Sequence, residues 1–214
     1  MMELNSYIES TNLSPTLNGK EVDALVKEAL DFGFRSVCIP PFWLRRGQRE
    51  IGRHDLGLVT VIGYPLGYQM TEAKEKEVEL ALKDGATELD IVMNLSAFSD
   101  GSPWVRTELV RLGQRIHTEG ALMKVIVETD LWTNEQLIEI IKLVSDSGAD
   151  FFKTSTGYHR PAVTPALISF IRDHLPAEVG IKASGGIREP IQARQLIEAG
   201  ADRLGTSSGK IMVS

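Results

Sequence analysis

The chain has little cysteine and lacks any long apolar run. Cys38 is its one cysteine, which excludes an intrachain disulfide and is typical of a reducing compartment. No stretch approaches the ~18 consecutive apolar residues of a membrane-spanning helix. The N-terminal segment MMELNSYIES contains acidic residues in place of the apolar centre of a signal peptide. We therefore expect a cytoplasmic protein that does not bind membranes.

Positive charge and histidine are also scarce. With 23 Lys and Arg against 29 Asp and Glu, the net charge is −6, which argues against a nucleic-acid partner because such a surface carries a basic stripe. The histidines show no metal-ligand spacing, so no metal is predicted; they are His54, His117, His159 and His174. A hydrophobic content of 43% is typical of a globular protein, and 214 residues suit a single domain over 1–214.

A repeated layout runs along the chain. Four times an apparent helix is followed by a glycine, a short linker and an apolar run; the glycines are Gly33, Gly85, Gly148 and Gly200. Glycine suits the left-handed conformation directly after a helix. Apolar residues at helical spacing predict helices around 22–30 and 137–144. Thr133 with Gln136 is predicted to form a capping box, and Thr164 is predicted to cap a helix that starts at Pro165.

Eight apolar runs are predicted strands, mostly continuous as expected for parallel strands covered on both faces. They are 7–11, 36–40, 58–63, 88–94, 122–129, 151–155, 180–184 and 203–207. Helical segments separate most of them. Eight such units predict an α/β fold, the (β/α)8 TIM barrel, with a doubly wound sheet as the alternative.

Glycine and serine gather where the last two predicted strands end. Ser184-Gly185-Gly186 follows the seventh strand, ahead of a helix expected near Arg188, and the segment 205–209 (GTSSG) follows the eighth. Glycines let backbone N–H groups approach an anion closely, and serines add hydroxyl donors. Each loop alone could be an ordinary turn. Their position at the two strand ends that often bind phosphate in a barrel favours a phosphate site.

Three lysines and a carboxylate lie inside four consecutive predicted strands: Asp90, Lys124, Lys153 and Lys182. A buried ion-pair network that stabilises the barrel would explain them without any catalysis. Buried charges are costly, however, and are often retained for function. A lysine attacks a carbonyl only as the free amine, and a second ammonium group nearby favours that form. The pair Lys153 and Lys182, with Asp90 to move protons, therefore predicts Schiff-base chemistry on a phosphorylated carbonyl compound.

Seven stretches, in order along the chain, also carry a family resemblance. They are SVCIPP, VIGYPLG, ELDIVMN, KVIVET, GADFFKTSTG, VGIKASGGIR and AGADRLGTSSG. Together they resemble the deoxyribose-phosphate aldolases, the DeoC-type class I aldolases, over nearly the whole chain, and KTSTG with KASGG is a highly specific pair. The resemblance implies reversible, cofactor-free cleavage of 2-deoxy-D-ribose 5-phosphate into D-glyceraldehyde 3-phosphate and acetaldehyde.

The resemblance also implies roles for individual residues. Lys153 matches the Schiff-base lysine, Lys182 the lysine that lowers the pKa of the first, and Asp90 the proton-relay acid. The other matched positions line the same site or bind phosphate: Lys124, Thr154, Gly185, Gly186, Ser207 and Ser208. Cys38 matches an active-site cysteine of the family, although the chemistry does not require a thiol and a plain core cysteine is the alternative.

The chain departs from the family pattern in three places. Glu9-Ser10-Thr11 stands where an Asp-His-Thr run is usual, so Glu9 and Thr11 are expected near the sugar with altered contacts. Tyr158-His159-Arg160 follows KTSTG, where many members carry phenylalanine or lysine; His159 and Arg160 could contact phosphate or face solvent. The sequence ends at Ser214, without the C-terminal tail whose tyrosine assists proton transfer in some members.

Alternatives from other classes remain at this point. The chain could be another Schiff-base lyase acting on a related sugar phosphate, or a weakened paralogue that only binds one. A metal-dependent aldolase is disfavoured by the histidine spacing. The partner expected is a small phosphorylated sugar or aldehyde, and the sequence leaves a homodimer and a homotetramer open.

Overall fold

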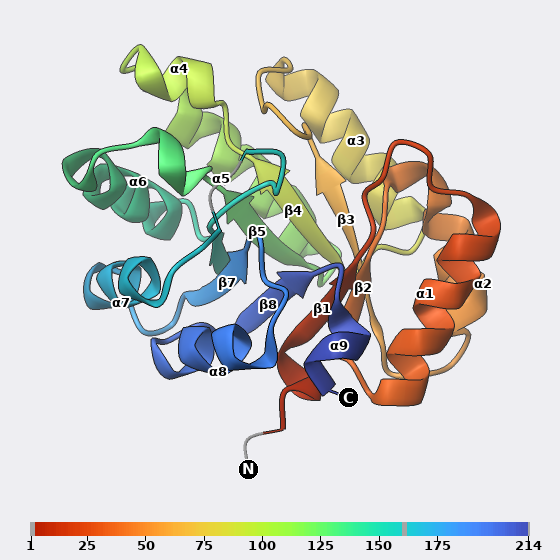
Figure 1. Cartoon of the computed structure of the whole chain (residues 1–214). Coiled ribbons are helices and arrows are strands. Elements are labelled where there is room, and N and C mark those ends of the chain that lie inside the picture. Colours follow the sequence, from red (N-terminus) through yellow and green to blue (C-terminus); the bar gives the residue numbers. More distant parts are fainter. Residues whose placement is uncertain (1–2, 160–161, 214) are drawn as a thin grey trace.

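The computed structural model describes residues 3–159 and 162–213. Eight parallel strands form a closed barrel in chain order, with β1 paired to β8 (Figure 1). The strands are β1 (Ile8–Thr11), β2 (Ser36–Cys38), β3 (Gly57–Ile62), β4 (Glu88–Val92), β5 (Leu122–Ile126), β6 (Phe151–Lys153), β7 (Gly180–Ser184) and β8 (Arg203–Thr206). All eight predicted strands are confirmed, and the closed ladder rules out a doubly wound sheet.

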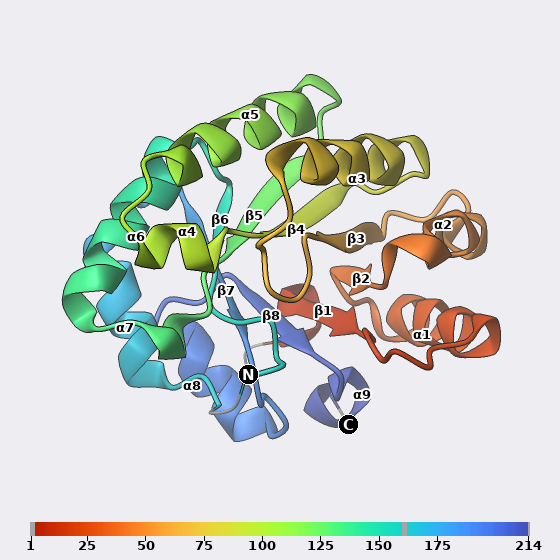
Figure 2. The same cartoon turned by 90° about the horizontal axis from the view of Figure 1, so that it is seen from above.

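Helices surround the barrel, as the view from above shows (Figure 2). They are α1 (Gly19–Phe32), α2 (Leu44–Ile51), α3 (Thr71–Lys83), α4 (Leu95–Ser99), α5 (Trp104–Thr118), α6 (Asn134–Asp146), α7 (Pro165–His174), α8 (Pro190–Glu198) and α9 (Gly209–Val213). Short 3-10 turns lie at η1 (Asn5–Tyr7), η2 (Pro41–Trp43) and η3 (Thr129–Leu131). A helix follows every strand, so the fold is the predicted (β/α)8 barrel.

Local sequence signals account for many of the helix ends. Thr133 and Gln136 form the predicted capping box at α6, and the side chain of Thr164 accepts from the backbone N–H of Leu167 at α7. The four glycines after helices all have positive φ, between 65° and 113°, where a side chain would be strained. The helix expected near Arg188 begins at Pro190, because proline fixes φ at a helical value and suits the first helical position.

Six strands end one to three residues earlier than predicted, and two of them, β5 and β6, border the candidate site. β5 ends at Ile126 and β6 at Lys153, although apolar and β-branched residues continue beyond both. Glu128 interrupts β5 because its backbone is left-handed, with φ 53° and ψ 67°. The segment after β6 instead forms hydrogen bonds between its own side chains and backbone.

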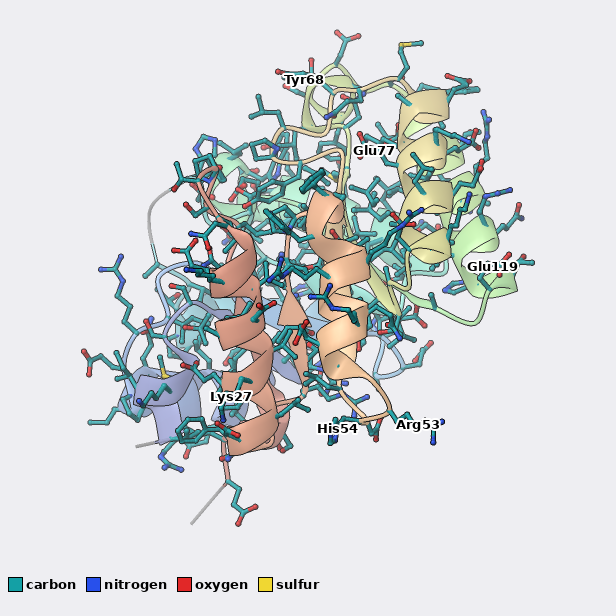
Figure 3. The ribbon with its side chains drawn as sticks, turned by 90° about the vertical axis from the view of Figure 1, so that its right-hand side faces the viewer. Lys27, Arg53, His54, Tyr68, Glu77 and Glu119 are labelled. Atoms are coloured by element: carbon teal, nitrogen blue, oxygen red, sulfur yellow. The ribbon has the colours of Figure 1, made fainter. Side chains whose placement is uncertain are left out.

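The apolar core lies between the strands and the surrounding helices, whereas the barrel interior holds a charged layer. Phe152, Ile181 and Leu204 are fully buried in that apolar core, because each alternates along its strand with residues that face the barrel interior. Figure 3 shows the two ends: Tyr68, in the loop after β3, lies at the upper end, and Arg53 and His54, after α2, lie at the lower end. The upper end holds the C-terminal ends of the strands, where barrels carry their sites. In the described part of the chain, no helix is long and apolar enough to cross a membrane.

Candidate active site

Four charged side chains from adjacent strands lie buried in the barrel. Asp90 on β4, Lys124 on β5 and Lys182 on β7 have no exposed surface, and Lys153 on β6 is 3% exposed. Strand register places Asp90 opposite Lys124 and Lys153 opposite Lys182. Because side chains alternate between the two faces of a strand, this register directs all four toward the same interior space.

The carboxylate of Asp90 connects the three ammonium groups. Its Oδ2 accepts hydrogen bonds from Lys153 Nζ and from Lys182 Nζ, each at 2.7 Å. Its Oδ1 accepts from Lys124 Nζ at 3.2 Å. A single oxygen is thus shared by both lysines of the predicted pair, which places their nitrogens close together without direct contact.

Two further carboxylates complete the buried charge network. Glu9 accepts a short hydrogen bond from Lys182, and its other oxygen lies 3.5 Å from Lys124 Nζ and 3.8 Å from Arg203 Nε. Glu88 Oε2 lies 2.5 Å from Lys124 Nζ. Three carboxylates therefore face three lysines. Within residues 3–159 and 162–213, no group of three or more His, Cys, Asp or Glu side chains is arranged to hold a metal ion.

The network fixes the charge of its central members. Burial by itself would raise the pKa of Asp90, but the charges of Lys124, Lys153 and Lys182 outweigh burial and hold that pKa far below its usual value. Burial would lower the pKa of Lys182, but Asp90 and Glu9 outweigh it and raise that pKa well above its usual value. Asp90 is therefore ionised, and Lys182 positively charged, throughout the neutral pH range.

A cavity of about 530 Å³ opens above this network at the C-terminal ends of the strands. Its lining residues are Thr11, Asn12, Leu13, Ser14, Pro15, Tyr64, Lys153, Thr156, Gly157, Tyr158, Ser184, Gly185, Gly186, Ile187, Arg188, Gly205, Thr206 and Ser207. Lys153 is the lysine of the network that reaches this cavity, whereas Lys124 and Lys182 lie beneath it. The size is that of a small-molecule site.

Several predicted site residues meet in this cavity. Gly185 and Gly186 come from the end of β7, Ser207 from the end of β8 and Thr11 from the end of β1. Gly186 has φ 67°, and a Cβ there would lie 2.7 Å from Cβ of Ala162. Both the backbone conformation and the close packing therefore require glycine at this position.

Other predicted residues lie outside the cavity. The hydroxyl of Thr154 donates to the backbone oxygen of Ser184 and accepts from its N–H, which links β6 to β7. Ser208 lies directly before α9, and its N–H donates to Thr206 Oγ1. Cys38 is fully buried beside Val59, and burial raises the pKa of its thiol to about 11. Glu9 is also outside the cavity and is fully buried. The roles expected for all four residues remain predictions.

The residues that follow KTSTG differ in their position relative to the cavity. Tyr158 lines the cavity, and its ring meets the ring of Tyr64 edge-on at 5.5 Å between centroids. His159 is exposed and is not among the lining residues. Arg160 lies outside the residues that the structure describes, so the prediction about its contacts is not tested.

Sequence reasoning missed several residues that shape the cavity. Tyr64 Oη donates to the backbone oxygen of Thr156 at 2.6 Å, and Thr156 itself lines the cavity. Arg188 also lines it and is exposed. Arg188 could have been found, since it directly follows the Gly185-Gly186 loop and has the charge for an anion. The bond from Tyr64 joins residues far apart in sequence and had no local signal.

Known proteins with similar sequences cover nearly the whole chain. Residues 5–212 match the model of the DeoC/LacD family aldolases. A deoxyribose-phosphate aldolase of Thermococcus gammatolerans is 40% identical over 211 residues, which covers 97% of this chain and 94% of that protein.

Solved structures give the same result. The aldolase QR15 superposes with a TM-score of 0.94 at 38% identity, covering all of this chain and 95% of the other. A tetrameric deoxyribose phosphate aldolase from Aeropyrum pernix superposes with a TM-score of 0.92 at 36% identity, covering 98% of this chain and 89% of that chain. The likeness therefore extends to sequence and fold together.

Proposed function

The chain belongs to the DeoC/LacD family of aldolases, and from that membership we propose that it reversibly cleaves 2-deoxy-D-ribose 5-phosphate into D-glyceraldehyde 3-phosphate and acetaldehyde. The observation that carries this proposal is the access of Lys153: it lines the cavity and also touches the buried Asp90. An amine in that position can reach a carbonyl carbon in the cavity while its proton passes to a neighbouring group.

Lys153 is the proposed nucleophile. Its neutral amine attacks the C1 aldehyde, and loss of water leaves an iminium ion, which draws electrons from the C2–C3 bond as the C3 hydroxyl loses its proton. Glyceraldehyde 3-phosphate departs, the remaining enamine takes a proton at C2, and hydrolysis then releases acetaldehyde. The assignment between the two lysines follows from their surroundings, since Lys182 lies below the cavity and is bonded to both Asp90 and Glu9.

Lys182 and Asp90 are the proposed electrostatic and proton-handling partners. The ammonium group of Lys182 shares Asp90 Oδ2 with Lys153, and a fixed positive charge beside Lys153 favours its neutral, attacking form. Asp90 lies within 2.7 Å of both nitrogens, which is close enough to pass protons during carbinolamine formation and dehydration. Lys124 is proposed to hold Asp90 in place through its bond to Oδ1.

Phosphate is proposed to bind opposite Lys153, at the mouth of the cavity. The loop of Gly185 and Gly186 and the loop that contains Ser207 both line this region. Their backbone N–H groups and hydroxyls are donors suited to a phosphate group. Arg188 adds a positive charge at the same wall. The polar end of the substrate would thus be held while its aldehyde faces Lys153.

We also propose a homo-oligomeric state and a cytoplasmic location. The first is supported by the tetramer of the Aeropyrum pernix relative, which is 36% identical, and light scattering after size-exclusion chromatography measures it directly. The second is supported by the scarcity of cysteine. A monomer at micromolar concentration would contradict the first proposal.

The reaction is tested by measuring acetaldehyde release from 2-deoxyribose 5-phosphate in excess EDTA. A Schiff base replaces the Lewis acid of a metal-dependent aldolase, so full activity is expected with the chelator. Activity that is lost to EDTA and restored by zinc would contradict the Schiff-base proposal. Release of acetaldehyde only from a different sugar phosphate would favour another lyase of the same chemistry.

A further inference from the structure

Glu128 is a buried carboxylate beside the site that the reaction scheme above does not use. It follows β5 and has no exposed surface. Its Oε2 accepts hydrogen bonds from the backbone N–H of Thr156, at 3.1 Å, and from the Thr156 hydroxyl, at a shorter distance. A buried carboxylate is costly unless donors satisfy it, and here both bonds come from one residue of the cavity wall.

The backbone at Glu128 is unusual in a way that directs this side chain. Its φ of 53° is left-handed, the one non-glycine case in residues 3–159 and 162–213, and such a conformation is strained for a residue that carries a side chain. The flanking N–H groups of Val127 and Thr129 donate to the adjacent oxygens of Lys153 and Thr154. The segment after β5 thus has one extra residue against the segment after β6, as in a β-bulge, a feature that redirects a side chain next to a site.

The contacts of Glu128 continue through the segment 154–158 to the far wall of the cavity. The hydroxyl of Thr156 donates to Glu128 and accepts from the N–H of Tyr158 at 3.1 Å. Tyr64 holds the Thr156 carbonyl from the opposite side. The carboxylate of Glu128 therefore holds the middle of the segment that begins directly after Lys153 and ends at Tyr158, and both of these residues line the cavity.

We propose that Glu128 is a positioning residue for the reaction: its carboxylate holds residues 154–158 so that Lys153 and Tyr158 face the same bound substrate. The proposal rests on the proposed function for the role of Lys153. Glu128 itself does not line the cavity and is not proposed to touch the substrate. The bonds to Thr156 help to stabilise the strained backbone and the extra residue after β5.

The test compares three variants in the full-length protein. Glu128→Gly removes the carboxylate but tolerates the left-handed backbone, Glu128→Gln keeps an oxygen acceptor without the charge, and Thr156→Val removes the hydroxyl. For the glycine variant we expect kcat/KM for 2-deoxyribose 5-phosphate to fall on the order of tenfold to a hundredfold, the loss typical of a misplaced group. We expect the glutamine variant to stay within about threefold of the original enzyme, since a neutral acceptor still satisfies both donors.

Amide hydrogen exchange makes the test independent of turnover. Exchange at residues 156–158 should become faster in Glu128→Gly and in Thr156→Val, and stay slow in Glu128→Gln. Ile116→Val, in the buried face of α5, is the control for a general loss of stability and should leave that exchange unchanged relative to distant amides.

Equal activity in Glu128→Gly and the original protein would overturn the positioning role. Equal loss of kcat/KM in the glycine and glutamine variants would also overturn the positioning role. Activity would then depend on the charge of Glu128 and not on the hydrogen bonds that hold residues 154–158. If the original protein does not cleave 2-deoxyribose 5-phosphate, the proposed function fails, while unchanged exchange in Glu128→Gly would still separately reject the role of Glu128.

Discussion

Removal of the ammonium group of Lys182 is expected to raise the pH at which the enzyme becomes active. Lys182→Met removes this positive charge. Burial by itself would lower the pKa of Lys182, but Asp90 and Glu9 outweigh burial and raise that pKa, so Lys182 stays charged in the original protein. Because that charge is constant over the assay range, its loss acts as a fixed change in the field at Lys153. The acid limb of kcat/KM is then expected to move to higher pH, because a fixed positive charge beside an attacking amine favours its neutral form.

The size of the shift follows from the shared oxygen. Both nitrogens lie 2.7 Å from Asp90 Oδ2, so at most about 5.4 Å, twice that bond length, separates them. At this distance two unit charges repel by about 3 kcal/mol with an effective dielectric constant of about 20. Since 1.36 kcal/mol corresponds to one pH unit, the limb should move by about two units.

A second substitution, of opposite charge, tests the direction in which the acid limb moves. Glu9→Gln removes a negative charge from the same network, so it should move the acid limb to lower pH. The double variant Lys182→Met with Glu9→Gln restores the original net charge, and its limb should lie between those of the single variants. Circular dichroism of each variant establishes that the barrel is intact.

The assay is the rate of borohydride-trapped adduct formation with acetaldehyde, measured from pH 5 to pH 10 in single-turnover conditions. This rate depends on the free amine of Lys153 and avoids later proton transfers in which Lys182 could also take part. An acid limb that stays in place in Lys182→Met, or moves in the same direction as in Glu9→Gln, would refute the electrostatic role of Lys182.

Three further expectations concern single residues. Lys153→Ala should abolish the borohydride adduct while leaving the circular dichroism spectrum unchanged; an adduct that persists at Lys182 would reverse the assignment of the two lysines. Cys38 should resist iodoacetamide in the folded protein at pH 8, since a thiol pKa of about 11 leaves about one thiolate in a thousand, whereas rapid alkylation with loss of activity would contradict this burial. Lys74→Met should lower the free energy of unfolding by about 3–5 kcal/mol in urea titrations, because it leaves the buried Glu108, which bonds Lys74 Nζ at 2.7 Å, without its cation; a change below about 1 kcal/mol would contradict that account.

Short-range patterns in the sequence determined the elements of this barrel. The helix ends at Gly33, Gly85, Gly148 and Gly200 and the caps at Thr133 and Thr164 depend on neighbours within a few residues, so they could be predicted. The apolar runs likewise predicted that Lys153, Lys182 and Asp90 lie inside strands, although charged residues seldom do. The residue motifs indicated the aldolase family before any geometry was known.

Closure of the barrel decided how those residues meet. Glu9 bonds to Lys182 although 173 positions separate them, and Tyr64 reaches Thr156 across 92; no local period in the sequence encodes such contacts. The same closure placed Lys153 at the cavity while Thr154, Cys38 and Ser208 lie outside it. The left-handed backbone of Glu128 was equally hidden, because a glutamate does not normally adopt it and the bonds around it, to Thr156 and to the chain after Lys153, form only when β5 and β6 lie side by side.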